Sequence, residues 1–175
     1  TCAIHDNGVA CWGRNSYGEK TVPELSNPTQ VSRGWGSHTC ALDDTGVVCW
    51  GNNSNGQTTV PALSNPTQVS AGGGHTCAVD DTGVVCWGST GTTPALTNPI
   101  MVDARVNKTC ALDDTGIVCW GNNSYGDLTV PELSNPRSVS KGYDHTCALD
   151  DNGVVCWGRN WHGLLTVPLL TIDPD

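Results

Sequence analysis

Short apolar runs alternate with polar turns along the chain, and this pattern predicts β-strands. Between residues 38 and 70 the apolar runs are 38–42, 46–50, 58–61 and 67–70. β-Branched and aromatic residues occupy these runs, whereas Gly, Pro, Asn and Asp occupy the segments between them. No window keeps an apolar period of 3.6 residues, so helices are not expected. The sequence predicts an all-β protein.

The same pattern returns five times, and paired cysteines mark each copy. In every copy a second cysteine follows the first by nine positions, with Trp-Gly directly after it. Successive first cysteines stand 38, 37, 33 and 37 residues apart. Four short strands in about 37 residues are typical of a propeller blade. We therefore expect one β-propeller repeat domain over residues 1–175, with repeats at about 1–38, 39–75, 76–108, 109–145 and 146–175.

The two ends bear on how many blades the propeller has. The fourth apolar run occurs four times although there are five cysteine hairpins, and residues 171–175 end at what resembles the Asn-Pro turn of the other copies. Either a five-bladed ring closes imperfectly, or these blades belong to a larger propeller. We favour the larger propeller because closed propellers avoid open sheet edges.

Each cysteine pair flanks a turn and fits a cross-strand disulfide. With a two- or four-residue loop centred on Asp44-Thr45, Cys40 lies opposite Cys49, about 4.5 or 5.5 Å away between Cα atoms. A three-residue loop with Gly46 as a bulge would offset the two by one position. Reduced thiols and zinc ligands are alternatives, but no C-x2-C spacing of a zinc site occurs. The predicted pairs are Cys2–Cys11, Cys40–Cys49, Cys77–Cys86, Cys110–Cys119 and Cys147–Cys156.

Composition and charge restrict the function. Disulfides indicate an oxidising setting, so we expect an extracellular, periplasmic or cell-surface protein. The sequence has no signal peptide and no transmembrane stretch, which indicates a mature form or an excised segment. A net charge of −9 with 8 Lys and Arg argues against nucleic acid and anionic membranes as partners. Three sequons, at Asn52, Asn107 and Asn122, are glycosylation candidates in a eukaryotic source.

The recurring histidines do not form a predicted metal site. His38, His75 and His145 precede Thr-Cys in their repeats, but equivalent positions on neighbouring sheets lie about 10 Å apart. We expect these side chains to bond to loop backbone. No G-x-S-x-G or H-E-x-x-H motif occurs, so the sequence predicts no catalytic residue, no cofactor and no enzyme.

Paired acids and tryptophans also recur with the repeat. The acid pairs could be calcium ligands, but adjacent acids in a hairpin are expected to form turns. The tryptophan of each Cys-Trp-Gly is expected to pack in the core. The acid pairs are Asp43-Asp44, Asp80-Asp81, Asp113-Asp114 and Asp150-Asp151, and the tryptophans are Trp12, Trp50, Trp87, Trp120 and Trp157.

The shared text of the copies, H-[ST]-C-A-L-x-x-x-G-x-V-x-C-W-G-x-N-x-x-G, resembles the repeats of the regulator of chromosome condensation family. Its cysteine-paired form resembles the copies found in secreted and surface proteins. Residues 51–62, GNNSNGQTTVPA, are also similar to the repeat of the secreted β-lactamase inhibitory propeller. The resemblance implies a propeller, normally of seven blades, that is not catalytic and presents loops on one face to a protein partner. The third repeat departs from the pattern, because Ser89-Thr90-Gly91 replaces a longer loop and Arg105–Lys108 replaces Gly-x-x-His.

Variable aromatic residues at repeated loop positions are the predicted binding residues. In the inhibitory propeller, the matching positions carry aromatics that touch the partner. Packing between adjacent loops is the alternative. We expect a protein-binding or structural module, with a carbohydrate-binding lectin or a secreted enzyme inhibitor as alternatives. The candidate partner-binding residues are Trp35, Tyr143 and Asp144, then Tyr17, Tyr125 and Trp161.

Overall fold

The computed structural model describes residues 1–6 and 8–168, and its regular structure is almost entirely β. In these residues the strands form antiparallel sheets: one of two strands, β1-β2, and four of three strands. Each three-stranded sheet consists of one short strand followed by a cysteine hairpin. A single 3-10 turn, η1 (Trp161–Gly163), follows the last strand. The strands are β1 (Cys2–His5), β2 (Gly8–Cys11), β3 (Gln30–Arg33), β4 (His38–Asp43), β5 (Gly46–Gly51), β6 (Gln68–Ala71), β7 (His75–Asp80), β8 (Gly83–Gly88), β9 (Met101–Arg105), β10 (Lys108–Asp113), β11 (Gly116–Gly121), β12 (Ser138–Lys141), β13 (His145–Asp150) and β14 (Gly153–Gly158).

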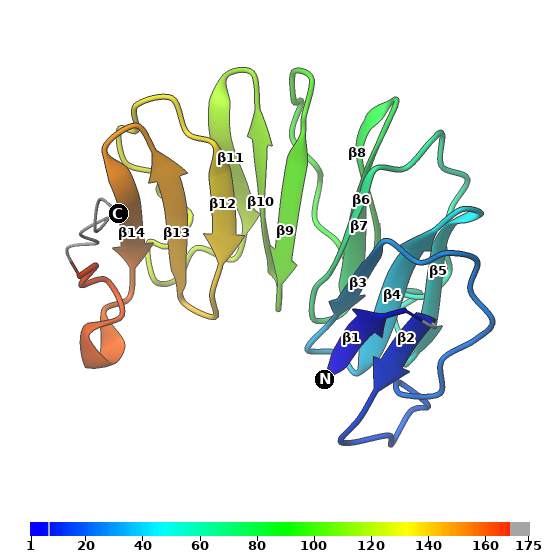
Figure 1. Ribbon diagram of the computed structural model, residues 1–175. Helices are drawn as coiled ribbons and strands as arrows, with labels where there is room; N and C mark the ends of the chain where they lie inside the picture. Colours follow the sequence, from blue (N-terminus) through cyan, green and yellow to red (C-terminus); the bar gives the residue numbers. More distant parts are fainter. Residues whose placement is uncertain (7, 169–175) are drawn as a thin grey trace, which may run out of the picture.

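The sheets stand side by side along an arc, as the blades of a propeller do (Figure 1). We number the blades one to five by their hairpins, from β1-β2 to β13-β14. The inner strands β3, β6, β9 and β12 contact one another in sequence. Side chains of each inner strand bond to the backbone of the next: the Ser32 hydroxyl accepts from the Ala71 amide at 3.0 Å, and the Ser70 hydroxyl accepts from the Ala104 amide at 2.9 Å. The all-β propeller expected from the sequence is confirmed.

All five predicted disulfides are present, each within one hairpin. Cys40 lies directly opposite Cys49, and Asp43 pairs with Gly46 across a loop of two residues. Gly46 has φ of 118°, a value that side-chain-bearing residues rarely adopt, so the turn requires glycine. The two-residue loop is thus correct, and the bulged alternative is wrong.

The expectation of four strands per blade is wrong, because the run 58–61 forms no ladder. Its amides bond locally instead: the Thr58 amide donates to Asn53 Oδ1 at 2.9 Å, and the Thr59 amide donates to the Gly56 carbonyl at 3.0 Å. Pro61 has no amide hydrogen to donate. The fourth predicted run, 67–70, is confirmed as β6, which pairs with the hairpin that follows it.

The hydrophobic core lies between adjacent blades. Blade two supplies Cys40 and Leu42, and blade three supplies Val69, Ala78 and Trp87, to one buried cluster. Three of the five tryptophans are about nine-tenths buried, as predicted: Trp50, Trp87 and Trp157.

The prediction of a core tryptophan fails in the first blade, where Trp12 is 54% exposed. The buried Trp50 and Trp87 each donate the indole N–H to a carbonyl in the loop of the preceding repeat. Trp120 is only partly buried.

Candidate binding face

At one end of the strands lie two sets of loops, which together we call the loop face. The first set joins each inner strand to its hairpin, and the second set follows each Trp-Gly. The two sets are bonded to each other, since the Asn52 amide donates to the Ser37 carbonyl and the Ser89 amide to the Gly74 carbonyl. The Asp-Asp turns lie at the opposite end of the strands.

Two predicted binding aromatics meet on the loop face. Trp35 follows β3 and Tyr143 follows β12, yet their ring centroids lie 5.5 Å apart at an interplanar angle of 56°. Trp35 is 59% exposed and Tyr143 is 51% exposed. The guanidinium carbon of Arg105, from the end of β9, lies 5.4 Å from the Trp35 ring centroid, within range of a cation–π contact. Blades two, four and five therefore contribute to one group on the loop face.

A second exposed group lies beside blade five. The Arg159 guanidinium carbon is 4.5 Å from the Tyr125 ring centroid and 3.4 Å from that of Trp161. Arg159, Trp161 and Tyr143 share the wall of a cavity of about 240 Å³ with Asp144, His145 and Leu164. This cavity joins the predicted residues of two different loops.

Beneath these aromatics lies a buried ion cluster. The Asp127 carboxylate accepts from Lys141 Nζ at 2.6 Å and from Lys108 Nζ at 2.7 Å. Lys108 Nζ also lies 3.3 Å from Asp144 Oδ1. Burial opposes ionisation of Asp127, but the two lysines outweigh it and lower the pKa of that carboxyl. The cluster fixes the base of the loops that carry Tyr125 and Tyr143.

The remaining candidates occupy different surroundings. Asp144 is only 8% exposed, and its Oδ2 lies 3.6 Å from Arg159 Nη1. It therefore forms ion pairs with both Lys108 and Arg159 beneath the exposed rings. Tyr17 is 54% exposed on the loop of blade one. Trp35, Tyr143, Tyr125 and Trp161 thus lie over one part of the face, while Tyr17 contacts none of the described aromatic rings.

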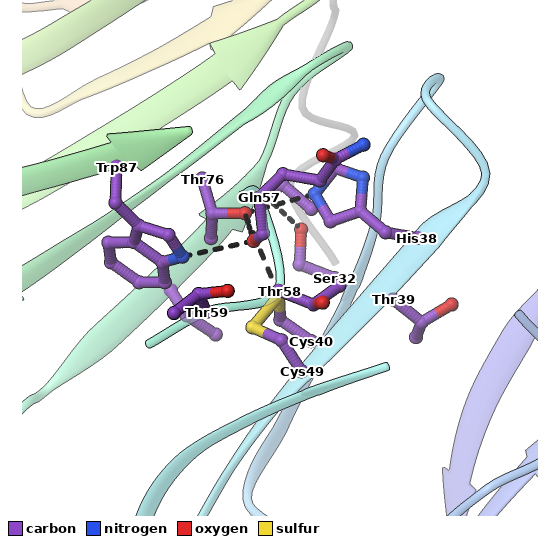
Figure 2. Close-up of a disulfide and its surroundings, with 12 residues drawn as sticks. Ser32, His38, Thr39, Cys40, Cys49, Gln57, Thr58, Thr59, Thr76 and Trp87 are labelled. Atoms are coloured by element: carbon purple, nitrogen blue, oxygen red, sulfur yellow. Dashed lines mark hydrogen bonds between the residues drawn. A yellow bond between two sulfur atoms is a disulfide. The ribbon is translucent and has the colours of Figure 1, made fainter. Parts of the chain in front are cut away.

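His38 and His75 each bond to a threonine hydroxyl of the next blade, a partner that the sequence did not predict. His38 Nε2 lies 3.0 Å from the Thr76 hydroxyl, and His75 Nε2 lies 2.9 Å from the Thr109 hydroxyl. Because the Thr76 hydroxyl donates to the Gln57 carbonyl, His38 must donate from Nε2 (Figure 2). Burial lowers the pKa of His38 to about 4 and lowers that of His75 as well.

The first acid of each pair caps its own turn. Asp43 Oδ1 accepts from the Thr45 amide at 2.8 Å, and Asp43 Oδ2 accepts from the Ser26 amide at 2.8 Å. Asp80, Asp113 and Asp150 repeat these contacts. In the part of the chain that the structure describes, no group of three His, Cys, Asp or Glu residues could hold a metal ion.

The sequon asparagines lie on the loop face. Asn52 Nδ2 donates to the Gly36 carbonyl at 3.0 Å, and Asn122 Oδ1 accepts from the Ser124 amide at 3.0 Å. Asn107 is exposed at the tip of the β9–β10 turn. Their glycosylation stays a prediction. Over residues 1–6 and 8–168 the structure has no helix that is long and apolar enough to cross a membrane.

Sequence reasoning missed Glu19, Gln57 and Asp127, which are all fully buried. Each follows the glycine of the loop after Trp-Gly, a segment that we treated as a polar loop. A charged or amide residue at the same place in three copies was the available signal. The cations Arg105 and Arg159 were also missed, because nothing in the sequence shows which rings they reach.

The profile of the "Regulator of chromosome condensation (RCC1) repeat" matches residues 29–57, 67–91 and 137–163. In these three segments the chain matches RCC1 repeats. Solved structures with a similar fold include two receptor ectodomains. The ectodomain of the Physcomitrella patens receptor kinase CR4 is 25% identical with a TM-score of 0.78, over 91% of this chain and 50% of that one. The ectodomain of the Arabidopsis thaliana receptor kinase ACR4 is 26% identical with a TM-score of 0.70, over 92% of this chain and 59% of that one.

The RCC1 fold is also seen in Prp20p of Saccharomyces cerevisiae, which is 16% identical with a TM-score of 0.68, over 93% of this chain and 53% of that one. No curated protein sequence matches the chain significantly. The chain thus spans about half the length of the solved structures that it resembles.

Proposed function

We propose that this chain is a non-catalytic, extracellular or cell-surface module that binds a protein partner through its loop face. The observation that carries this proposal is a layer of exposed rings, Trp35, Tyr143 and Trp161, with the half-buried Arg105 and Arg159 against them. Tryptophan, tyrosine and arginine dominate the binding energy of protein interfaces, especially when a rigid scaffold holds them. Here disulfide-closed blades supply the scaffold.

The fold does not require aromatic residues at these loop positions. At the position of Trp35 and Tyr143, blade three has Gly73, and its blade is complete without an aromatic. Tyr125 likewise corresponds to Asn55 in blade two. The aromatic set also differs from blade to blade, which favours one composite protein interface over the repeated sugar sites of a lectin. The Trp35 and Tyr143 rings contact each other, and both stay more than half exposed.

An extracellular location is supported by two observations. Every cysteine of the chain is in a disulfide, a state that oxidising compartments maintain. The two receptor kinase structures are ectodomains. A protein partner is further supported by the solved structure of Prp20p, which was characterised for its binding to Gsp1p and histones.

A capture experiment tests the proposal. The immobilised protein is exposed to the extracellular medium of its source, and bound proteins are identified by mass spectrometry. We expect Trp35→Ala and Tyr143→Ala each to weaken capture by about 2 kcal/mol or more, roughly thirtyfold, with folding intact.

The matched control is Ile100→Ala. Ile100 is 68% exposed but stands at the Asp-Asp end, where its amide donates to the Leu112 carbonyl. This substitution removes exposed apolar area while leaving the loop face unchanged, so capture should persist. Equal losses in the control and in Trp35→Ala would refute a binding role for the loop face.

A further inference from the structure

At three blade junctions, a loop residue of one blade closes the gap to the next, and we call it the plug residue. The plug residues are Glu19, Gln57 and Asp127. The Gln57 carbonyl accepts from the Thr76 hydroxyl at 2.8 Å and from the Trp87 indole N–H at 3.0 Å (Figure 2). The Glu19 carbonyl accepts the same pair of donors from blade two, and the Asp127 carbonyl accepts the Thr146 hydroxyl.

Each plug residue also packs on the glycine that follows the next blade's tryptophan. A Cβ at Gly51 would lie 3.1 Å from Glu19 Cβ, and one at Gly88 would lie 3.1 Å from Gln57 Cα. At Gly158 the corresponding distance to Asp127 Cβ is 2.6 Å. These close approaches leave no space between loop and blade.

The junction between blades three and four has no plug residue. The shortened loop Ser89–Gly91 ends before that position, and the nearest atoms to a Cβ at Gly121 belong to Asn107 and Lys108 of blade four itself. A cavity of about 220 Å³ lies there, lined by Thr109, Trp120, Gly121, His75, Cys86, Ser89, Thr90, Gly91 and Asn107. One water needs only about 15 Å³ of such space, so the cavity has room for a side chain.

The donors that hold a plug residue elsewhere are present in this cavity. Thr109 and Trp120 occupy the positions of Thr76 and Trp87 and pair with each other across β10 and β11 in the same register. In the described chain the Trp120 indole N–H donates to no protein carbonyl, unlike that of Trp87. The Thr109 hydroxyl contacts His75 alone among described side-chain oxygens and nitrogens.

Each charged plug residue faces a side chain of opposite charge on the inner strand of the next blade. Arg33 faces Glu19 at 3.6 Å and Lys141 faces Asp127 at 2.6 Å. The equivalent positions, which pair with Thr76 and Thr109, are Ala71 at the junction of the neutral Gln57 and Ala104 at the junction that holds the cavity. A carboxylate buried without a cation is strongly disfavoured. The cavity therefore suits an uncharged amide.

We propose that this cavity, the plug site, receives a glutamine side chain and its backbone carbonyl from a loop of a protein partner. The inference rests on the proposed function in that the occupant comes from a partner protein. The partner's carbonyl would accept from Thr109 and Trp120, as the Gln57 carbonyl accepts from Thr76 and Trp87. The glutamine would meet no opposite charge from the inner strand, because Ala104 there is uncharged, as Ala71 is at the Gln57 junction.

The probe for a direct test is a cyclic peptide that contains Asn-Ser-Asn-Gly-Gln-Thr-Thr, the sequence of residues 53–59. It is titrated into the 15N-labelled full chain while the indole N–H resonances are followed. We expect the resonance of Trp120 to move downfield as its hydrogen bond forms, with those of Trp50 and Trp87 unchanged. A peptide with glutamate in place of the glutamine should bind at least tenfold more weakly.

A loop-graft variant is the matched control. Replacing Ser89–Gly91 by Asn-Asn-Ser-Asn-Gly-Gln supplies a plug residue in cis, so the variant should melt at a higher temperature and no longer bind the peptide. Ala104→Lys should reverse the preference from glutamine to glutamate. An unmoved Trp120 resonance at millimolar peptide, or equal affinity for the graft variant, would overturn the proposal.

The plug site can be tested separately from the aromatic layer. Trp35→Ala should leave peptide binding unchanged, because Trp35 does not line the cavity. Peptide binding with no protein captured by the loop face would retain the plug site and reject the proposed function. Capture of a partner that is equally strong with the graft variant would retain the proposed function and reject the plug site.

Discussion

Replacing Asp127 by glutamine should destabilise the junction between blades four and five. The Asp127 side chain is fully buried and accepts from Lys108 and Lys141, and the Lys141 side chain is itself fully buried. Removing one partner of a buried ion pair costs about 3–5 kcal/mol, because the other charge remains buried without compensation. For a chain of this size, that loss lowers the melting temperature by about 10 °C.

The chain itself provides the compensating variant. At the junction of blades two and three, the plug residue is the uncharged Gln57, and Ala71 occupies the position of Lys141. We therefore expect Asp127→Gln combined with Lys141→Ala and Lys108→Met to regain stability to within about 1 kcal/mol of the original. These changes remove Asp127 together with both of its lysines, and Asp144 keeps Arg159 as its partner.

Methionine is chosen at position 108 because histidine would not fit. In blade three the ring of His75 lies 2.4 Å from the Cβ position of Gly72, and the residue at that place in blade four is Arg105. A ring at position 108 would meet the Cβ of Arg105. A methionine keeps the length of the lysine and removes the charge.

Urea unfolding followed by circular dichroism measures both variants, and hydrogen exchange at β12 and β13 locates the effect. Acid provides a second readout. The folded-state pKa of Asp127 is lowered, so its stabilisation is present above the unfolded-state pKa, near 3.9, and is lost as the pH falls through the folded-state value. Asp127→Gln should lack this acid-dependent loss. A cost below about 1 kcal/mol, or a triple variant weaker than the single one, would refute the reasoning.

Three further outcomes follow from the structure. Trp50→Ala should cost about 3–5 kcal/mol of stability in thermal unfolding, whereas Trp35→Ala should leave the melting temperature unchanged; equal destabilisation would make Trp35 a packing residue. Replacing Cys40 and Cys49 together by alanine should cost about 2.5–3 kcal/mol in urea, and non-reducing peptide mapping of the parent should join these two cysteines; links between repeats would contradict the structure. His38, whose pKa burial lowers to about 4, should stay neutral in an NMR titration until well below pH 6, and stability should fall between about pH 6.5 and 4 as the unfolded chain takes up its proton; titration near 6.5 would show that the ring is not buried.

The fold was largely predictable because the repeat encodes it locally. The nine-residue spacing of Cys40 and Cys49 across a turn determined the hairpin, the disulfide and the register together. The strand at 58–61 was predicted wrongly because its apolar residues fit a strand, whereas its amides find nearer acceptors in Asn53 and Gly56.

The binding face was predictable only in part. The exposure of Trp35 and Tyr143 followed from their position in loops where other repeats have small residues. Their contact could not be predicted, because it joins residues of blades two and five and depends on the curvature of the arc. The sequence showed that the third repeat has a shorter loop. That this loop leaves a cavity could not be predicted, because the buried position of Gln57 in the longer loop was not known.

Because Gln57 and the other plug residues act on the following blade, the array can be treated as a chain of units coupled to their neighbours. In such a system, stability divides into a term for each unit and a term for each interface. The junction of blades three and four lacks the two plug hydrogen bonds and the packing on Gly121. We therefore expect its interface term to be smaller than that of the junction between blades two and three, so that blades one to three and blades four and five unfold as two cooperative blocks.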